Sequence, residues 1–298
     1  MINNMLLPMA YKMPVFLVAA GLLTIGAATA AAQEPADPQT TATQTAAEPA
    51  PIADNSFLVE EAYNQEWGVV QHISSFTRFW QGRDWAFTFT QEWPVNRAPR
   101  HQLSYTLMAE RPGAGGSGGF GDVALNYRYQ LLGGGDATVA FSPRFSVLLP
   151  TGNSSRGRGA GGVGFQTNLP FSIRTGKRLV THWNAGATFV PSARNEAGER
   201  AFAAGYNLGQ SFVWLAHPRF NVLLETVWHS MDSVVAPDTT VRENSLLISP
   251  GIRWAHNLPG GLQIVPGVAV PIGAGPSRGE TGIIFYLSLE HPFRRRAD

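Results

Sequence analysis

The chain between residues 119 and 150 alternates apolar and polar positions with a period of two. Nearly every second residue from Val123 to Leu131 is apolar or aromatic, and the alternation returns from Val139 to Leu149. A run of three glycines (133–135) separates the two stretches. Strands whose two faces meet different environments show this period, and a glycine-rich turn between them predicts an antiparallel hairpin. Apolar runs of about 9–11 residues match a tilted strand that crosses a bilayer, so we expect a hairpin of a transmembrane β-barrel.

Twelve strand-like runs follow one another along the chain. We expect them at 68–80, 84–94, 101–109, 120–132, 136–149, 163–174, 178–191, 201–215, 219–230, 244–256, 261–272 and 281–293. From the third strand onward, long connections alternate with short ones. The long ones are 111–119, 151–162, 192–200, 231–243 and 273–280, and the short ones are 133–135, 176–177, 217–218 and 257–260. Outer-membrane barrels combine long outer loops, short periplasmic turns and an even number of strands. The sequence therefore predicts an all-β fold, a single antiparallel transmembrane barrel over 68–293 with both termini in the periplasm.

Two features limit this strand assignment. Pro143, Pro170, Pro250 and Pro266 fall inside expected strands, although proline donates no ladder hydrogen bond. We expect bulges or shortened strands at these positions. The first run alternates poorly, so its register is not fixed by the pattern.

The N-terminal part of the chain has a different composition. Residues 1–32 carry one charge (Lys12), an apolar stretch and three alanines (30–32), which predicts a secretory signal peptide, with a retained membrane anchor as the alternative. Residues 33–54 are rich in proline, alanine and threonine, which predicts a disordered linker. Residues 55–67 carry capping residues followed by acidic ones, and we expect a short helical or plug-like segment at or inside the periplasmic mouth.

Overall charge and cysteine content narrow the possible partners. The formal net charge of the 298 residues is +1, only two are lysines and none is cysteine. These values argue against nucleic-acid binding and exclude a disulfide framework.

The last strand ends at Phe293, which resembles the terminal aromatic signal for barrel assembly, although a tail (294–298) follows it. We therefore expect outer-membrane lipid, the barrel-assembly machinery and a small-molecule solute as partners.

Charged residues and one histidine share the polar faces of the strands. The candidates for lining the lumen are Glu92, Asp122, Arg128, Arg144, Glu225, His229, Arg253 and Glu290. In one interpretation they form cross-strand ion pairs that fill a narrow barrel. In the other they line a path, where the three arginines would favour anionic solutes such as aromatic carboxylates.

No stretch of the sequence carries a clear catalytic, cofactor or metal motif. Residues 113–118 match GxGxxG in form, but they join two strands and precede no helix, so a flexible loop is expected. The seven histidines lack the spacing of metal ligands. A lipid-acting enzyme would need a serine and a histidine that face lipid, and no flanking motif singles out such a serine. We expect neither catalytic residues nor a cofactor nor a metal.

Several separate stretches resemble one known family. NSFLVEEAYNQEWGVVQHI (55–73), QEWPV (91–95), RHQLSYTL (100–107), GFGDVALNYRYQL (119–131) and LLPTG (148–152) resemble the outer-membrane barrels labelled as putative MetA-pathway phenol-degradation proteins. The resemblance covers roughly residues 55–293, with Trp67 where the family pattern has proline. It implies a channel or transporter for small solutes, hydrophobic or aromatic compounds among them. A filled structural or binding barrel and a lipid-acting enzyme remain the alternatives.

Overall fold

The computed structural model describes residues 52, 54–96, 98–113, 115–135 and 137–293. The expected signal peptide, most of the expected linker and the tail lie outside these residues. No helix in the described part of the chain is long and apolar enough to cross a membrane.

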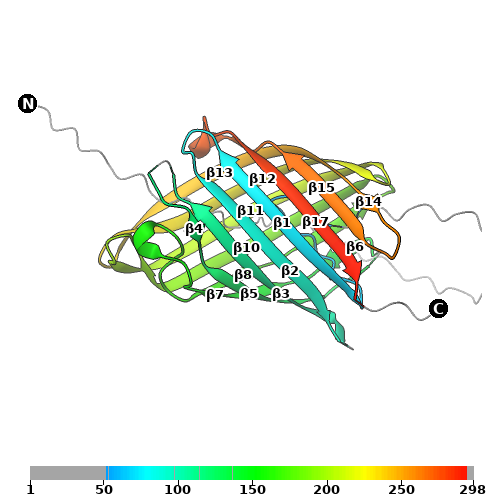
Figure 1. Cartoon of the computed structure of the whole chain (residues 1–298), viewed down its shortest axis with the longest axis horizontal. Coiled ribbons are helices and arrows are strands. Elements are labelled where there is room, and N and C mark those ends of the chain that lie inside the picture. The colour runs from blue at the N-terminus through cyan, green and yellow to red at the C-terminus, as the bar shows by residue number, and fades with distance from the viewer. Residues whose placement is uncertain (1–51, 53, 97, 114, 136, 294–298) are drawn as a thin grey trace, which may run out of the picture.

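The described chain forms a closed antiparallel barrel of 12 strands (Figure 1). Five of these strands are interrupted and carry two labels each. The strands are β1 (Val69–Phe79), β2 (Trp85–Val95), β3 (Ala98–Arg111), β4 and β5 (Gly119–Phe120, Val123–Tyr129), β6 and β7 (Val139–Phe141, Arg144–Leu149), β8 and β9 (Gly164–Asn168, Phe171–Thr175), β10 (Leu179–Arg194), β11 (Arg200–His217), β12 (Phe220–Ala236), β13 and β14 (Thr239–Trp254, His256–Asn257), β15 and β16 (Gln263–Ala269, Ile272–Gly273) and β17 (Gly282–Pro292). Two short 3-10 helices occupy loops, η1 (Ser154–Arg156) and η2 (Gly275–Ser277).

The barrel closes between its first and last strands. Each strand pairs antiparallel with the next, and β1 pairs with β17 along its whole length, from Val69 opposite Pro292 to Phe79 opposite Gly282. Closure leaves no free sheet edge, so backbone groups along the wall find partners within the sheet. The expected fold class and strand number are confirmed.

The two faces of the wall differ as the alternation predicts. On β5 and β7, Leu125, Tyr127 and Phe145 are exposed on the outer surface, whereas Asn126 and Arg128 are buried on the inner one. Polar residues therefore face the lumen and apolar residues face outward.

Prolines coincide with three of the strand interruptions. Pro143 separates β6 from β7, Pro170 separates β8 from β9, and Pro271 separates β15 from β16. The first two breaks lie side by side, since Ser142 N donates to Pro170 O over 3.1 Å. Pro250 and Pro266 stay inside β13 and β15. The shortened strands expected at Pro143 and Pro170 are present, and no break occurs at the other two.

Two of the expected loops are wrong. The expected loop 231–243 is mostly strand, because β12 and β13 extend to a turn of Pro237 and Asp238. Asp238 takes a left-handed conformation (φ 52°), and an ion pair of 2.8 Å joins Arg242 to Asp232 across the hairpin. The expected loop 192–200 likewise shrinks to residues 195–199. Paired strands replace most of both loops.

The expected helix in residues 55–67 does not form. These residues contain no helix and run through the inside of the barrel as an irregular chain. Their backbone N–H groups bond to side chains of the barrel wall instead of to carbonyls four residues back, for the reasons given below.

Candidate functional site

Residues 54–66, called the lumen segment here, lie inside the barrel. Most of their side chains are buried, namely Asp54, Asn55, Ser56, Phe57, Val59, Glu61, Ala62, Tyr63 and Gln65. Because an irregular chain leaves its backbone groups unpaired, burial on this scale requires partners from elsewhere in the molecule. The wall of the barrel supplies them.

One end of the lumen segment is bound by β13 and β12. The Arg253 guanidinium donates to the carbonyls of Asp54 and Asn55 over 2.8 and 2.6 Å. The Glu225 carboxylate accepts from the backbone N–H groups of Leu58 and Val59 over 2.9 and 3.0 Å. These two charged residues, both expected to face the lumen, therefore bind peptide groups of the same segment.

Between these contacts, one hydroxyl pair joins the lumen segment to β11. The Oγ atoms of Ser56 and Ser211 lie 2.7 Å apart. Both serines are buried.

The middle of the lumen segment pairs with β10 and β9. The Asn184 amide oxygen accepts from Glu60 N over 2.9 Å, and its nitrogen donates to Glu60 O. The Ser172 hydroxyl accepts from Ala62 N over 2.8 Å. Asn184 thus binds both peptide groups of one residue, as a neighbouring strand would.

The other end of the lumen segment reaches β5 and β3. Gln130 accepts from Asn64 N over 2.8 Å and donates to Ala62 O over 2.7 Å. Gln102 accepts from Gln65 N over 2.7 Å. The lumen segment thus crosses the inside of the barrel from the β11–β13 part of the wall, past β10 and β9, to β5 and β3, and the chain then enters β1.

An apolar contact fixes the lumen segment at Phe57. Its ring packs against Val213, Leu223, Ile284 and Tyr286 of the wall, with the Tyr286 ring edge-on at a centroid distance of 5.3 Å. Two glycines make room for this ring. A Cβ at Gly267 or Gly251 would lie 2.4 or 2.5 Å from atoms of the Phe57 ring. These strand positions require glycine because the lumen segment approaches them closely.

A charged cluster holds the carboxylate of Glu60. Arg144 NH2 and Nε contact Glu60 Oε1 and Oε2 at 2.7 and 3.1 Å, and Arg128 NH2 lies 3.3 Å from Oε2. Glu92 lies 4.0 Å from Arg128 on the opposite side. Burial alone would raise the pKa of Glu60, but Arg144 and Arg128 together more than offset it, so that the pKa lies below its usual value.

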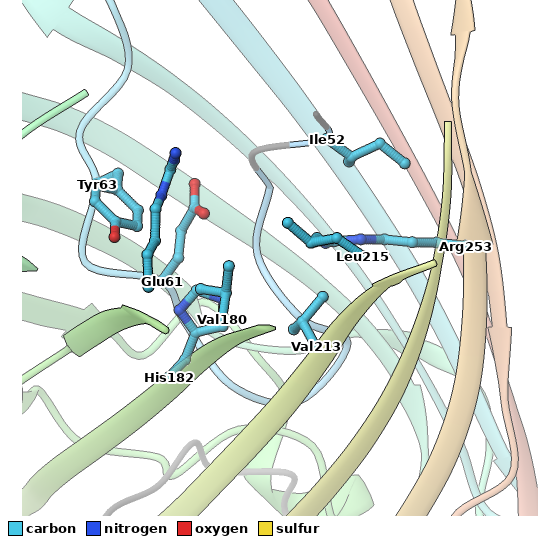
Figure 2. A pocket seen from close by; sticks show the side chains of 9 residues that line it. Ile52, Glu61, Tyr63, Val180, His182, Val213, Leu215 and Arg253 are labelled. Carbon is cyan, nitrogen blue, oxygen red and sulfur yellow. The ribbon is translucent and has the colours of Figure 1, made fainter. Parts of the chain in front are cut away.

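A small cavity lies beside the next residue, Glu61 (Figure 2). It is a partly open space between the lumen segment and the wall, with a cavity volume of about 20 Å³. Its lining residues are Ile52, Glu61, Tyr63, Arg174, Val180, His182, Val213, Leu215 and Arg253. Burial raises the pKa of Glu61 to about 8, and the nearby Asp54 adds to the rise. Glu61 is therefore protonated at neutral pH, unlike Glu60.

The loop between β7 and β8 is bound by two carboxylates of the barrel. Asp122 accepts from the N–H groups of Gly152 and Ala160 over 2.9 and 2.7 Å. Glu110 accepts from Gly159 N over 3.0 Å. Asp122 therefore holds this loop, rather than lining open space.

The eight residues expected to face the lumen separate into three groups. Glu92, Arg128, Arg144, Glu225 and Arg253 are buried around the lumen segment. Asp122 binds the loop. His229 on β12 and Glu290 on β17 lie on the inward face and are half-buried.

Sequence reasoning missed the neutral residues that bind the lumen segment. Gln102, Gln130 and Ser172 were not expected. Gln102 and Gln130 continue the inward alternation of β3 and β5, so the same parity would have found them. Asn184 is expected on the lumen side by this parity, but not as a partner of the lumen segment. Within the described residues, no group of three or more histidine, cysteine, aspartate or glutamate side chains is arranged to hold a metal ion.

No protein-family model matches the chain, and no curated protein matches its sequence. The resemblance to the MetA-pathway family therefore stays a prediction. Among solved structures, the chain is similar to the COG4313 outer membrane channel from Pseudomonas putida F1, with a TM-score of 0.57 and 11% identity over 77% of this chain and 97% of that one. It also aligns with the NanC porin (TM-score 0.49) and the KdgM porin (0.47), each at 8% identity over 75% of this chain and 100% and 99% of theirs. At 11% identity the likeness to the P. putida channel shows the fold alone, and the chain has the fold of an outer-membrane β-barrel.

Proposed function

We propose that the protein is an outer-membrane channel for small solutes, hydrophobic or aromatic compounds among them, whose lumen segment constricts the path. The observation that carries this proposal is the polar attachment of the segment. The peptide contacts described above are separate hydrogen bonds to wall side chains, each worth about 0.5–1.5 kcal/mol net where the side chain is neutral and about 1.5–3 kcal/mol where it is charged. Water can replace such bonds when the segment moves, whereas the continuous ladder of the wall stays intact.

The proposal includes the location and the orientation of the chain. The signal peptide would direct export, outer-membrane lipid would surround the apolar outer face, and the barrel-assembly machinery would insert the chain. Both termini would lie in the periplasm, because the lumen segment leads from the N-terminal side directly into β1. The protein is proposed to be a channel and not an enzyme.

A filled binding or structural barrel is the second candidate. It is favoured by the dense burial of the lumen segment and by the small size of the cavity beside Glu61. In this case the lumen segment would be a permanent part of the core and no solute would pass.

Planar-bilayer recordings on Asn184→Ala separate the two candidates. This substitution removes both bonds to the peptide groups of Glu60 and leaves the wall ladder in place. The channel proposal predicts more frequent or larger conductance steps than in the unmodified protein. Asn207→Ala is a matched control, because Asn207 is also buried on the inner face but its amide atoms have no hydrogen-bond partner among the described residues. Silence in every variant would contradict the channel proposal and support the filled barrel.

A further inference from the structure

The wall holds Arg144 in place without help from the lumen segment. A guanidinium has five N–H donors. Three of them are taken by wall side chains, since NH1 donates to Asn126 Oδ1 over 3.0 Å and to Ser146 Oγ, and NH2 donates to Gln166 Oε1 over 3.0 Å. These partners belong to β5, β7 and β8. The orientation of the guanidinium is therefore fixed by the barrel.

The two remaining donors of Arg144 form a fork that points to a carboxylate. Nε–H and the second NH2 hydrogen bind the two oxygens of Glu60, at 3.1 and 2.7 Å. Two parallel N–H···O bonds are the geometry in which arginine recognises planar carboxylates. The carboxylate that fills this fork comes from the lumen segment and not from the wall.

The wall charges at Arg128, Arg144 and Glu92 sum to a net positive charge, which one more anion would neutralise. Arg128 and Arg144 are direct cross-strand neighbours, and like charges in this arrangement repel. Glu92 is the wall carboxylate near them, 4.0 Å from Arg128. Two positive charges therefore face one negative charge until Glu60 arrives. The Glu60 side chain keeps 16% of its surface exposed, against 3% and 9% for Arg128 and Arg144, so the anion position is open on the Glu60 side.

We propose that Arg144 and Arg128 form a binding site for the carboxylate group of a solute, and that Glu60 occupies this site as a tethered competitor. This inference rests on the proposed channel function and names its solute class, monocarboxylates. A solute that takes the fork displaces Glu60, and the lumen segment then keeps only its neutral contacts in this region. Binding of the solute and release of the lumen segment are thereby coupled, because the two carboxylates exclude each other.

Equilibrium dialysis of labelled benzoate against the purified protein in detergent tests the inference without requiring conductance. At about pH 6 a carboxylic acid of ordinary pKa is ionised. Glu60→Gln removes the competing charge, and we expect benzoate to bind about tenfold more tightly than to the unmodified protein. Benzamide, which has the same shape and no charge, should show no such gain.

Two further variants identify the site. Glu61→Gln is the matched control, because Glu61 is the adjacent residue and Glu60, not Glu61, forms the ion pairs with Arg128 and Arg144. Glutamine at this position cannot ionise and does not loosen the lumen segment, so this variant should bind benzoate no more tightly than the unmodified protein. Adding Arg144→Gln to Glu60→Gln should abolish the gain. Glu60→Asp, whose carboxylate is one methylene too short for the fork, replaces Glu60→Gln if that variant fails to assemble into a heat-resistant barrel.

The inference is overturned if Glu60→Gln binds benzoate no more tightly than the unmodified protein, if Glu61→Gln shows the same gain, or if the gain survives the loss of Arg144. Failure of the channel proposal looks different. In that case no variant conducts in bilayers, while the order of benzoate affinities is as expected.

Discussion

Two adjacent glutamates of the lumen segment have opposite electrostatic surroundings. Glu60 lies between two arginines, which hold its pKa below the usual value despite burial. Burial raises the pKa of Glu61 to about 8, and Asp54 adds to this rise while Arg253 and Arg128 oppose it. One glutamate is therefore ionised when the lumen segment is seated, and its neighbour is protonated.

This difference predicts that rising pH loosens the lumen segment. Glu61 has a raised pKa in the seated state and an ordinary one, near 4.5, when released. Its stabilising contribution is thus complete below about pH 4.5 and is lost as the pH rises through about 8. Asp54, whose pKa burial also raises, acts in the same direction. The seated state should weaken by at most about tenfold per pH unit for one such group.

Open probability in bilayers, measured between about pH 5 and pH 8, checks this prediction. Glu61→Gln, which cannot ionise, should have a flatter profile than the unmodified protein. Glu60 has a lowered pKa, so its stabilising contribution is lost as the pH falls and not as it rises. This loss occurs below the ordinary glutamate range and therefore outside the measured interval. An open probability that falls with rising pH would contradict the assignment.

At the scale of elements, the backbone groups of the lumen segment are hydrogen-bonded by side chains of the wall and not by a neighbouring strand. Side chains of six wall strands (β3, β5, β9, β10, β12 and β13) bond to its backbone as a neighbouring strand would, Asn184 most completely. Its local sequence, with capping residues before acidic ones, favours a short helix instead. The helix does not form because the partners that decide the conformation lie up to 232 residues away, as in the bond from Tyr286 to Asp54.

The close approach of Phe57 to the wall gives a second prediction. In Gly267→Ala the new Cβ would lie 2.4 Å from the Phe57 ring, so the ring must move. Overpacking of this kind costs about 1–3 kcal/mol, which should release the lumen segment about tenfold more often. Chymotrypsin cleavage after Phe57 or Tyr63, both buried when the segment is seated, measures the release.

Two controls accompany this measurement. Gly115→Ala adds the same methyl group where no atom lies within 4 Å, and it should leave cleavage unchanged. In the double variant with Phe57→Leu, the smaller side chain should make Gly267→Ala less disruptive than it is alone. Equal cleavage of Gly267→Ala and Gly115→Ala would show that Phe57 does not hold the segment.

At the scale of the whole molecule, the wall could be predicted from the sequence in detail, whereas a plug-like segment inside it could be expected but not its path or its partners. The period of two in residues such as Leu125, Asn126 and Tyr127 reports the two environments of a barrel wall directly. The twelve runs and the pairing of consecutive strands follow from local pattern and connection length. Closure between β1 and β17 then follows from the even number of strands.

The residues of the candidate site lie far apart in the sequence, and no local pattern shows that they come together. Arg128, Arg144 and Glu92 could be placed on inner faces by parity alone. That Glu60 completes their cluster could not, because its arginine partners follow it by 68 to 84 residues and its own segment has no regular period. The extended hairpin at Pro237 and Asp238 was missed for a different reason: its strand ends mix polar residues such as Asp232 and Arg242 with the apolar Val235 and Val241, and no clear period of two marks them.

Movement of the lumen segment to open a path can be tested with a reversible lock. The chain contains no cysteine, and the hydroxyl oxygens of Ser56 and Ser211 lie 2.7 Å apart, close to the spacing of a disulfide. The double variant Ser56→Cys, Ser211→Cys therefore ties the lumen segment to β11 when it is oxidised. We expect single-channel steps from the reduced form and none, or far fewer, from the oxidised form. Equal conductance in both forms would contradict the account, as would silence in both.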